Sequence, residues 1–129
     1  MFGANRWNVK GVPMVYCADH PSTALLETIV HMTDDLLPRS YQLLAIEAPD
    51  AIDIEKPSLP ADWETSERAT RRIGTAFARE NRAALMTIPS VIMPQARNYL
   101  LNPNHPDAKD IKIAETWRYP FDSRLLANS

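Results

Sequence analysis

The chain has 129 residues, of which 45% are hydrophobic and 23% charged, and its formal net charge is −2. This balance is typical of one globular domain rather than of a disordered or membrane chain. A slightly acidic chain has no excess of cations for a phosphate backbone, so we expect no direct nucleic-acid partner. Cys17 is the only cysteine, which excludes an internal disulfide, and no metal-ligand pair occurs at short spacing, so we expect no metal.

The apolar runs of the chain indicate its compartment. Residues 1–9 contain no apolar segment of the kind found in a secretory signal. No apolar run approaches the roughly 20 residues that a membrane-spanning helix needs. We therefore expect a cytoplasmic protein without a membrane partner.

The first predicted elements are a strand and a helix that follows it at once. Residues 12–17 form a short apolar run typical of a buried strand. The turn that follows, Asp19-His20-Pro21, offers an N-cap candidate and a proline that the first helical turn tolerates. A helix is predicted over 21–32, and Glu27 lies off its most apolar stripe, which is formed by Leu25, Leu26, Ile29 and Val30.

A second strand, a loop and a second helix are predicted next. Residues 41–48 read as a strand, and residues 49–62 as a loop in which two prolines exclude a helix. From 66 to 82, apolar residues fall on one face among arginines and glutamates, which is typical of a surface helix with one apolar side. Thr65 or Ser66 can cap that helix.

Short strands and turns are predicted for the last third of the chain. Residues 84–88 read as a strand, 91–93 as another short apolar piece, and 111–118 as a final alternating strand. The stretch 98–106 is too rich in turn residues to predict a long element. The pattern as a whole predicts an α+β fold, with a mixed or antiparallel sheet core and flanking helices.

The few glycines limit how a nucleotide could bind. Gly3, Gly11 and Gly74 form neither the Rossmann nor the P-loop spacing, so side chains would have to contact the phosphates. Arg6 beside Trp7 is the candidate for phosphate contact and stacking. Taken alone, such a pair is more often a surface charge next to a packing residue.

Other candidate residues also have structural explanations that the pattern alone favours. Tyr16 closes an apolar strand, where a ring often belongs to the core and its hydroxyl bonds to the backbone. Glu27 can lie on a solvated helix face, and Ser90 after a proline can satisfy a turn. A hydrolase with Cys17 as nucleophile is a further alternative, disfavoured because a thiol in an apolar strand is usually inert.

A series of short motifs nevertheless resembles the RES family, named for its Arg, Glu and Ser, in order and spacing over nearly the whole chain. These motifs are Asn5-Arg6-Trp7-Asn8, Gly11, Val15-Tyr16, Ala24-Leu25-Leu26-Glu27, His31, Pro89-Ser90, Asn98-Tyr99-Leu100-Leu101-Asn102-Pro103 and Pro120-Phe121-Asp122-Ser123-Arg124-Leu125. The resemblance implies a single RES domain over 1–129 with a fold related to ADP-ribosyltransferases. Family members usually have a further strand and arginine before this point, and two glycines at Ala4-Asn5, so the domain looks shortened at its N-terminus.

The resemblance also implies a function and a site. It implies the toxin of a bacterial toxin–antitoxin pair, which degrades NAD by cleaving the nicotinamide–ribose bond or transfers ADP-ribose. NAD would be the substrate, an Xre-type helix-turn-helix antitoxin would hold the toxin inactive, and a homodimer is implied by analogy. The implied catalytic residues are Arg6, Tyr16 and Glu27, and the implied substrate-binding residues are Arg6, Trp7, Tyr16 and Ser90. Because the N-terminus is short, a catalytically weak RES-fold module that acts through partner binding is the alternative.

Overall fold

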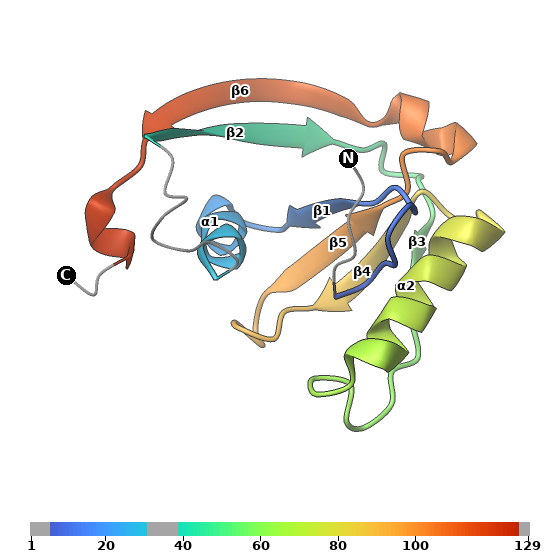
Figure 1. Cartoon of the computed structure of the whole chain (residues 1–129). Coiled ribbons are helices and arrows are strands. Elements are labelled where there is room, and N and C mark those ends of the chain that lie inside the picture. The colour runs from blue at the N-terminus through green and yellow to red at the C-terminus, as the bar shows by residue number, and fades with distance from the viewer. Residues whose placement is uncertain (1–5, 31–38, 127–129) are drawn as a thin grey trace.

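A computed structural model describes residues 6–30 and 39–126 of the chain (Figure 1). Helices and strands are interspersed along the chain, which confirms the predicted α+β class. In order, the elements are β1 (Val15–Ala18), α1 (Pro21–Ile29), β2 (Ser40–Glu47), β3 (Ile54–Glu55), α2 (Glu67–Glu80), β4 (Leu85–Pro89), β5 (Arg97–Leu101), the 3-10 helix η2 (Pro106–Asp110), β6 (Lys112–Pro120) and the 3-10 helix η3 (Ser123–Leu126).

The main sheet is mixed, as the sequence pattern predicted. Its strand order is β1-β5-β4-β3, and β3 runs parallel to β4 while the other pairs are antiparallel. The register aligns Tyr16, Leu100 and Met86 across three strands, and it aligns Asn98 with Ile88 in the next row on the same face. This face of the sheet therefore carries both core residues and Tyr16.

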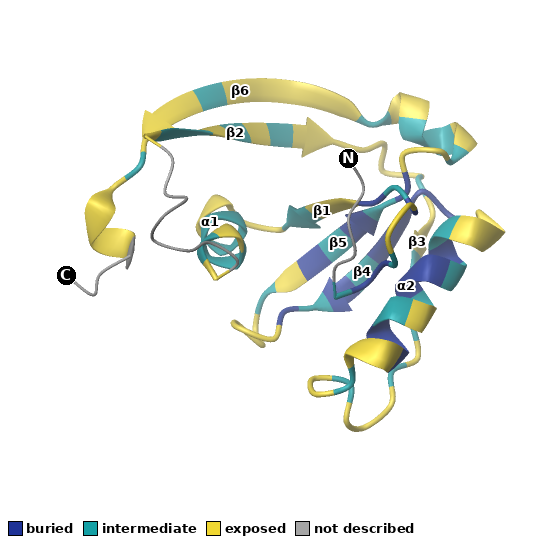
Figure 2. Cartoon of the chain, in the orientation of Figure 1, coloured by how far each residue is buried: buried dark blue, intermediate teal, exposed yellow. Residues whose placement is uncertain are grey.

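Helix α2 covers that face of the sheet and forms the core with it (Figures 1 and 2). Ser66 caps the helix, because its Oγ accepts a hydrogen bond from the N–H of Ala69 at 3.3 Å. Asn81 ends it in the left-handed conformation, with φ of 55°. Between the helix and the sheet lies a buried apolar cluster made by Trp7, Met14, Phe77, Ala83, Met86, Ile88 and Leu100.

Strands β2 and β6 form a separate two-stranded sheet (Figure 1). Their antiparallel register joins Tyr41 to Tyr119 and shifts once, between Ala45 and Ile46. The rings of Tyr41 and Tyr119 lie 5.9 Å apart between centroids, which is an aromatic contact across the strands. Several large apolar side chains remain exposed here, among them Ile113, of which 60% is exposed.

The structure corrects several of the expected element positions. The stretch beginning at residue 98 holds no long element, as expected, but it contains most of the short strand β5 (97–101), which was not predicted. The turn residues of this stretch follow the strand, and Leu100 faces the core. Residues 91–93, expected as a short apolar piece, are irregular. A turn follows them, in which Ala96 donates to the carbonyl of Met93 at 2.9 Å.

Smaller differences occur at three other predicted elements. The loop 49–62 contains the two-residue strand β3, which pairs with β4. The first strand begins at Val15 rather than at residue 12, because the chain before it turns, with Val12 donating to the carbonyl of Val9 at 3.3 Å. Helix α1 ends at Ile29 with Val30 as its C-cap, and the last two residues of the predicted helix, His31 and Met32, lie outside the described residues. Among the helices that the structure describes, none has the length and apolar character to cross a bilayer.

Candidate active site

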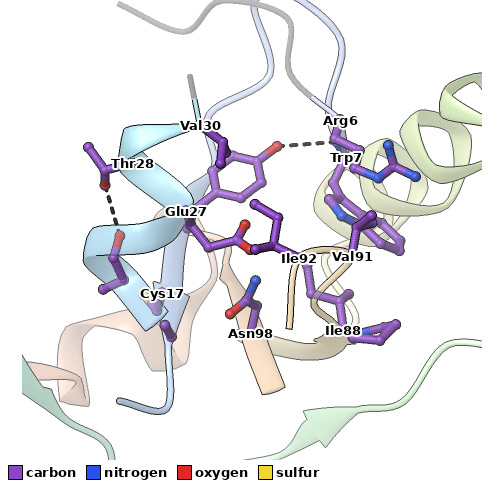
Figure 3. Close-up of a pocket in the computed structure, with 14 residues that line it drawn as sticks. Arg6, Trp7, Cys17, Glu27, Thr28, Val30, Ile88, Val91, Ile92 and Asn98 are labelled. Atoms are coloured by element: carbon purple, nitrogen blue, oxygen red, sulfur yellow. Dashed lines mark hydrogen bonds between the residues drawn. The ribbon is translucent and has the colours of Figure 1, made fainter. Parts of the chain in front are cut away.

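A cavity of about 380 Å³ lies between the N-terminal segment, β1, α1 and the turn that joins β4 to β5 (Figure 3). Four residues that the sequence analysis singled out, Arg6, Trp7, Tyr16 and Glu27, contribute to its lining. The fifth, Ser90, forms a hydrogen bond with Glu27. The fold therefore brings all five residues to one place, although they lie in four different parts of the chain.

Glu27 reaches the cavity from α1 and is oriented by Ser90. His20 caps the start of the helix, because its imidazole accepts a hydrogen bond from the N–H of Ser22 at 3.1 Å. Ser90 Oγ donates to Glu27 Oε1 at 2.8 Å and accepts from the N–H of Met93 at 3.1 Å. Ser90 is only 2% exposed and is bonded on both sides, so it fixes one oxygen of the Glu27 carboxylate against the core. The remaining acceptor sites of the carboxylate can bind a ligand.

Tyr16 lines the cavity with its ring and is held at its hydroxyl. The hydroxyl donates to Asn8 Oδ1 and accepts from the N–H of Trp7 at 3.3 Å. Burial raises the pKa of Tyr16 to about 12, although the Trp7 hydrogen bond and the charge of Arg71 oppose the rise. The phenol is therefore neutral at physiological pH, and it anchors the N-terminal segment to β1.

The guanidinium of Arg6 is directed away from Glu27 (Figure 3). It donates to the carbonyls of Trp63, at 3.0 Å, and Glu64, and it lies 3.9 Å from the Glu67 carboxylate. It also lies 5.8 Å from the centre of the Trp63 ring. In this arrangement, Arg6 contributes to the cavity wall, while its guanidinium links the N-terminal segment to the start of α2 through these contacts.

Trp7 is a core residue as well as part of the cavity wall. Only 3% of it is exposed, and its ring lies 6.3 Å from that of Trp63. The backbone around it is fastened to α2, because Thr70 Oγ1 donates to the carbonyl of Arg6 at 2.6 Å and Thr75 Oγ1 accepts from Val9 at 3.2 Å. Little of the Trp7 ring is therefore left for stacking against a ligand.

Cys17 also lines the cavity, but its thiol is poorly suited to nucleophilic attack. Burial raises its pKa to about 11, so almost none of it is thiolate near neutral pH. This protonation state argues against the cysteine hydrolase alternative. Within residues 6–30 and 39–126, no group of three His, Cys, Asp or Glu side chains is placed to hold a metal ion.

Several residues that shape the cavity were not predicted as site residues from the sequence. Asn8 is 3% exposed and bonds to both Tyr16 and the carbonyl of Val12. Asn98 is 8% exposed and lies on the floor near Ile88, while Val91 and Ile92 form an apolar wall. Both asparagines stand in the motifs that carried the family resemblance, and that was the signal available for them. Val91 and Ile92 were noted only as part of a short apolar piece.

The comparisons with known proteins agree with these motifs. Residues 1–122 match the RES domain. The Prs ADP-ribosylating toxin of Sphingobium sp. (strain YBL2) is 39% identical to this chain over 128 residues, covering 94% of this chain and 80% of the relative. Toxin Res of Pseudomonas putida is 39% identical over 126 residues, covering 95% and 86%, respectively. Toxin Res of Photorhabdus laumondii is 35% identical over 128 residues, covering 94% and 81%. The chain belongs to the RES domain family.

Proposed function

We propose that this protein is the toxin of a bacterial toxin–antitoxin pair and that it consumes NAD at the cavity around Glu27. The observation that carries the proposal is the Glu27 carboxylate, held by Ser90 at 2.8 Å in a cavity that Tyr16 also lines. The cavity volume of about 380 Å³ is at the small end of the range of ligand pockets, roughly 300–1,000 Å³. It is suited to the nicotinamide and ribose half of NAD rather than to the whole dinucleotide.

The chemistry of NAD cleavage matches a site with one carboxylate. The nicotinamide ring of NAD is a cation and leaves as a neutral molecule, so its departure needs no strong general acid. Positive charge develops on the ribose as the bond lengthens, and a carboxylate fixed beside it stabilises that charge without reorganising. On this proposal, Glu27 accepts from a ribose hydroxyl and stabilises the developing charge, while Ser90 holds Glu27 in position.

Arg6 is the proposed contact for the pyrophosphate. A guanidinium has five N–H donors and can bind a phosphate by two parallel hydrogen bonds. Its present contacts with the carbonyls of Trp63 and Glu64 would be exchanged in part for phosphate oxygens. Tyr16 would meanwhile hold the N-terminal segment that carries Arg6 beside the cavity, through its hydrogen bond to Trp7.

Release of nicotinamide from NAD by the purified chain tests the proposal. Glu27→Gln keeps the size of the side chain and an oxygen for Ser90 but removes the charge, so we expect release to fall about a hundredfold or more. Glu115→Gln is the matched control, because Glu115 is an exposed carboxylate on β6, and it should leave the rate unchanged. Equal release by wild type and Glu27→Gln, with both folded, would contradict the role of Glu27.

The acceptor of ADP-ribose distinguishes a hydrolase from a transferase. One relative is named an ADP-ribosylating toxin, which supports transfer to another molecule. Water, inorganic phosphate and a protein side chain would give free ADP-ribose, a phosphorylated ADP-ribose and a modified protein, respectively. Mass spectrometry of a reaction in cell extract, with NAD labelled in its adenosine half, identifies the acceptor directly.

An antitoxin is the proposed partner, of the Xre helix-turn-helix type that the family resemblance implies. The relatives named Toxin Res support a toxin role for this chain, and a toxin needs a partner that restrains it. The rim of the cavity offers such a partner exposed apolar side chains, because Val30, Val91 and Ile92 are each at least 37% exposed. Growth arrest on expression of the chain, relieved by co-expression of the antitoxin, would support this assignment.

Two further possibilities follow from the family resemblance. The chain can instead be a RES-fold module that turns over NAD poorly and acts through partner binding. That alternative predicts antitoxin binding without nicotinamide release, so the two assays together separate it from the enzyme. A homodimer is proposed by analogy, and sedimentation of the purified chain measures the state of association.

A further inference from the structure

Asn98 is a buried polar side chain at the floor of the cavity. It lies on β5, a strand with a neighbour on each side, and is paired in register with Ala18 of β1 and Ile88 of β4. Its exposed fraction is 8%, so more than nine-tenths of it is enclosed by the protein. An amide is expensive to enclose in this way unless its hydrogen-bonding groups are satisfied.

The acceptor side of the Asn98 amide has no partner in the described part of the chain. Its Oδ1 is fully enclosed and has no hydrogen-bond partner within the part of the chain that the structure describes. Its amide group is directed toward the Glu27 carboxylate across the cavity (Figure 3). Buried amides in native proteins almost always have partners, so an unsatisfied one beside a cavity points to a group supplied by a ligand.

The surroundings of Asn98 limit the chemistry of that ligand group. Ile88 and Ile92 contribute apolar surface beside the amide, which suits the face of a flat ring. An amide offers one donor side and one acceptor side, and another primary carboxamide complements both at once. A hydroxyl has a single oxygen and cannot pair with both sides in this way, while a carboxylate would be repelled by Glu27.

We propose that Asn98 recognises the carboxamide of nicotinamide by a reciprocal pair of hydrogen bonds. Asn98 Nδ2 donates to the carboxamide oxygen, and Asn98 Oδ1 accepts from the carboxamide nitrogen. The terminal torsion of an asparagine side chain is soft, so the amide turns to present both atoms to the ring that enters. The inference deepens the proposed function, and on it Asn98 determines specificity for the nicotinamide half of NAD while Glu27 acts on the ribose.

Ligand-observed NMR with free ring compounds tests the pairing without requiring turnover. Nicotinamide has both groups of the carboxamide, whereas 3-acetylpyridine keeps the carbonyl and replaces the amino group by a methyl. Loss of the amino group leaves Oδ1 unsatisfied, so we expect wild type to bind nicotinamide about tenfold more tightly than 3-acetylpyridine. Nicotinic acid, which carries a carboxylate, should bind still more weakly.

Asn98→Ala should bind nicotinamide and 3-acetylpyridine with nearly equal affinity, because it lacks both partners of the carboxamide. Asn98→Ser is a second variant with the same expectation, and thermal unfolding checks that each variant is folded. Asn104→Ala, which changes an exposed asparagine outside the cavity, should keep the tenfold preference of wild type. A wild type without preference between the compounds, or without measurable nicotinamide binding, would overturn the inference, and so would a folded variant that keeps the preference.

These outcomes are separate from the test of the proposed function. A wild type that prefers nicotinamide but releases none from NAD would remove the enzymatic proposal and leave Asn98 as a carboxamide-binding residue. A wild type that releases nicotinamide in a Glu27-dependent way but does not discriminate between the ring compounds would support the enzymatic proposal and remove the role of Asn98.

Discussion

The close approach of Gly74 to the N-terminal segment gives a sharp prediction for Gly74→Ala. Gly74 lies within α2, and a Cβ built on it would stand 1.9 Å from the carbonyl oxygen of Trp7 and 2.9 Å from its carbonyl carbon. In an ordinary helix the same change stabilises a protein, because alanine is about 1 kcal/mol better than glycine in a helix interior. Here the steric overlap reverses the sign.

The cost of Gly74→Ala follows from how far Trp7 must move. Ordinary contact between nonbonded atoms requires about 3.5 Å, so the Trp7 carbonyl and the helix must separate by roughly 1.5 Å. The backbone cannot separate freely, because Thr70 and Thr75 bond it to α2 on both sides of Trp7. Overpacking of this kind typically costs about 1–3 kcal/mol, and we expect a net loss near the upper end of that range.

Urea denaturation measures the free energy of unfolding, and thermal melting provides a second reading, with an expected fall in Tm of about 10 °C. Arg72→Ala on the exposed side of α2 is the control and should change stability by no more than about 0.5 kcal/mol. Nicotinamide release should also fall in Gly74→Ala, because the displaced Trp7 N–H is the donor to the Tyr16 hydroxyl. A Gly74→Ala protein as stable as wild type, or more stable, would refute the packing argument.

Two other changes test the cavity. Ser90→Ala removes the hydrogen bond that orients Glu27, so nicotinamide release should fall by up to about a hundredfold while Glu27 is still present, and an unchanged rate would show that Ser90 does not position it. The raised pKa of Cys17, about 11 against an ordinary 9.0, means that the folded state keeps the thiol proton longer than the unfolded state does. The free energy of unfolding should therefore fall as pH rises from about 9 to about 11, and this part of the fall should be missing in Cys17→Ala. Alkylation of native Cys17 by iodoacetamide at pH 8 should be slow until urea is added.

Local pattern predicted the secondary structure where one period dominates a segment. Helix α2 follows from apolar residues on one face and a capping serine, and both features depend only on near neighbours in the sequence. Strand β5 was missed because asparagines and prolines crowd the window that contains it, while Leu100 is buried against Met86, which is distant in sequence. Burial of this kind depends on the tertiary fold, so a local window cannot register it.

The grouping of the site residues could not be derived from spacing. Glu27 and Ser90 are 63 positions apart, and their hydrogen bond requires α1 and the turn after β4 to meet. The N-terminal segment carries no periodic signal at all, because Arg6, Trp7 and Asn8 lie outside any helix or long strand and are fixed by side-chain contacts. The family motifs assigned these residues to one site, but they did not indicate that the Arg6 guanidinium donates hydrogen bonds to the carbonyls of Trp63 and Glu64.

The site therefore joins parts of the molecule that differ in how firmly they are packed. Ser90 and Asn98 are buried beside the core, whereas none of the residues of α1 is buried. The hydrogen bond from Ser90 to Glu27 links this lightly packed helix to the sheet, next to an apolar rim that includes Val30 at the end of the helix. A molecule that fills the cavity or covers the rim would add contacts mainly to α1, because the sheet already has its own. Occupation of the site should consequently stabilise α1 and the position of the Glu27 carboxylate more than it stabilises the sheet. The position of Glu27 is therefore the feature of the proposed site that a partner can most easily control.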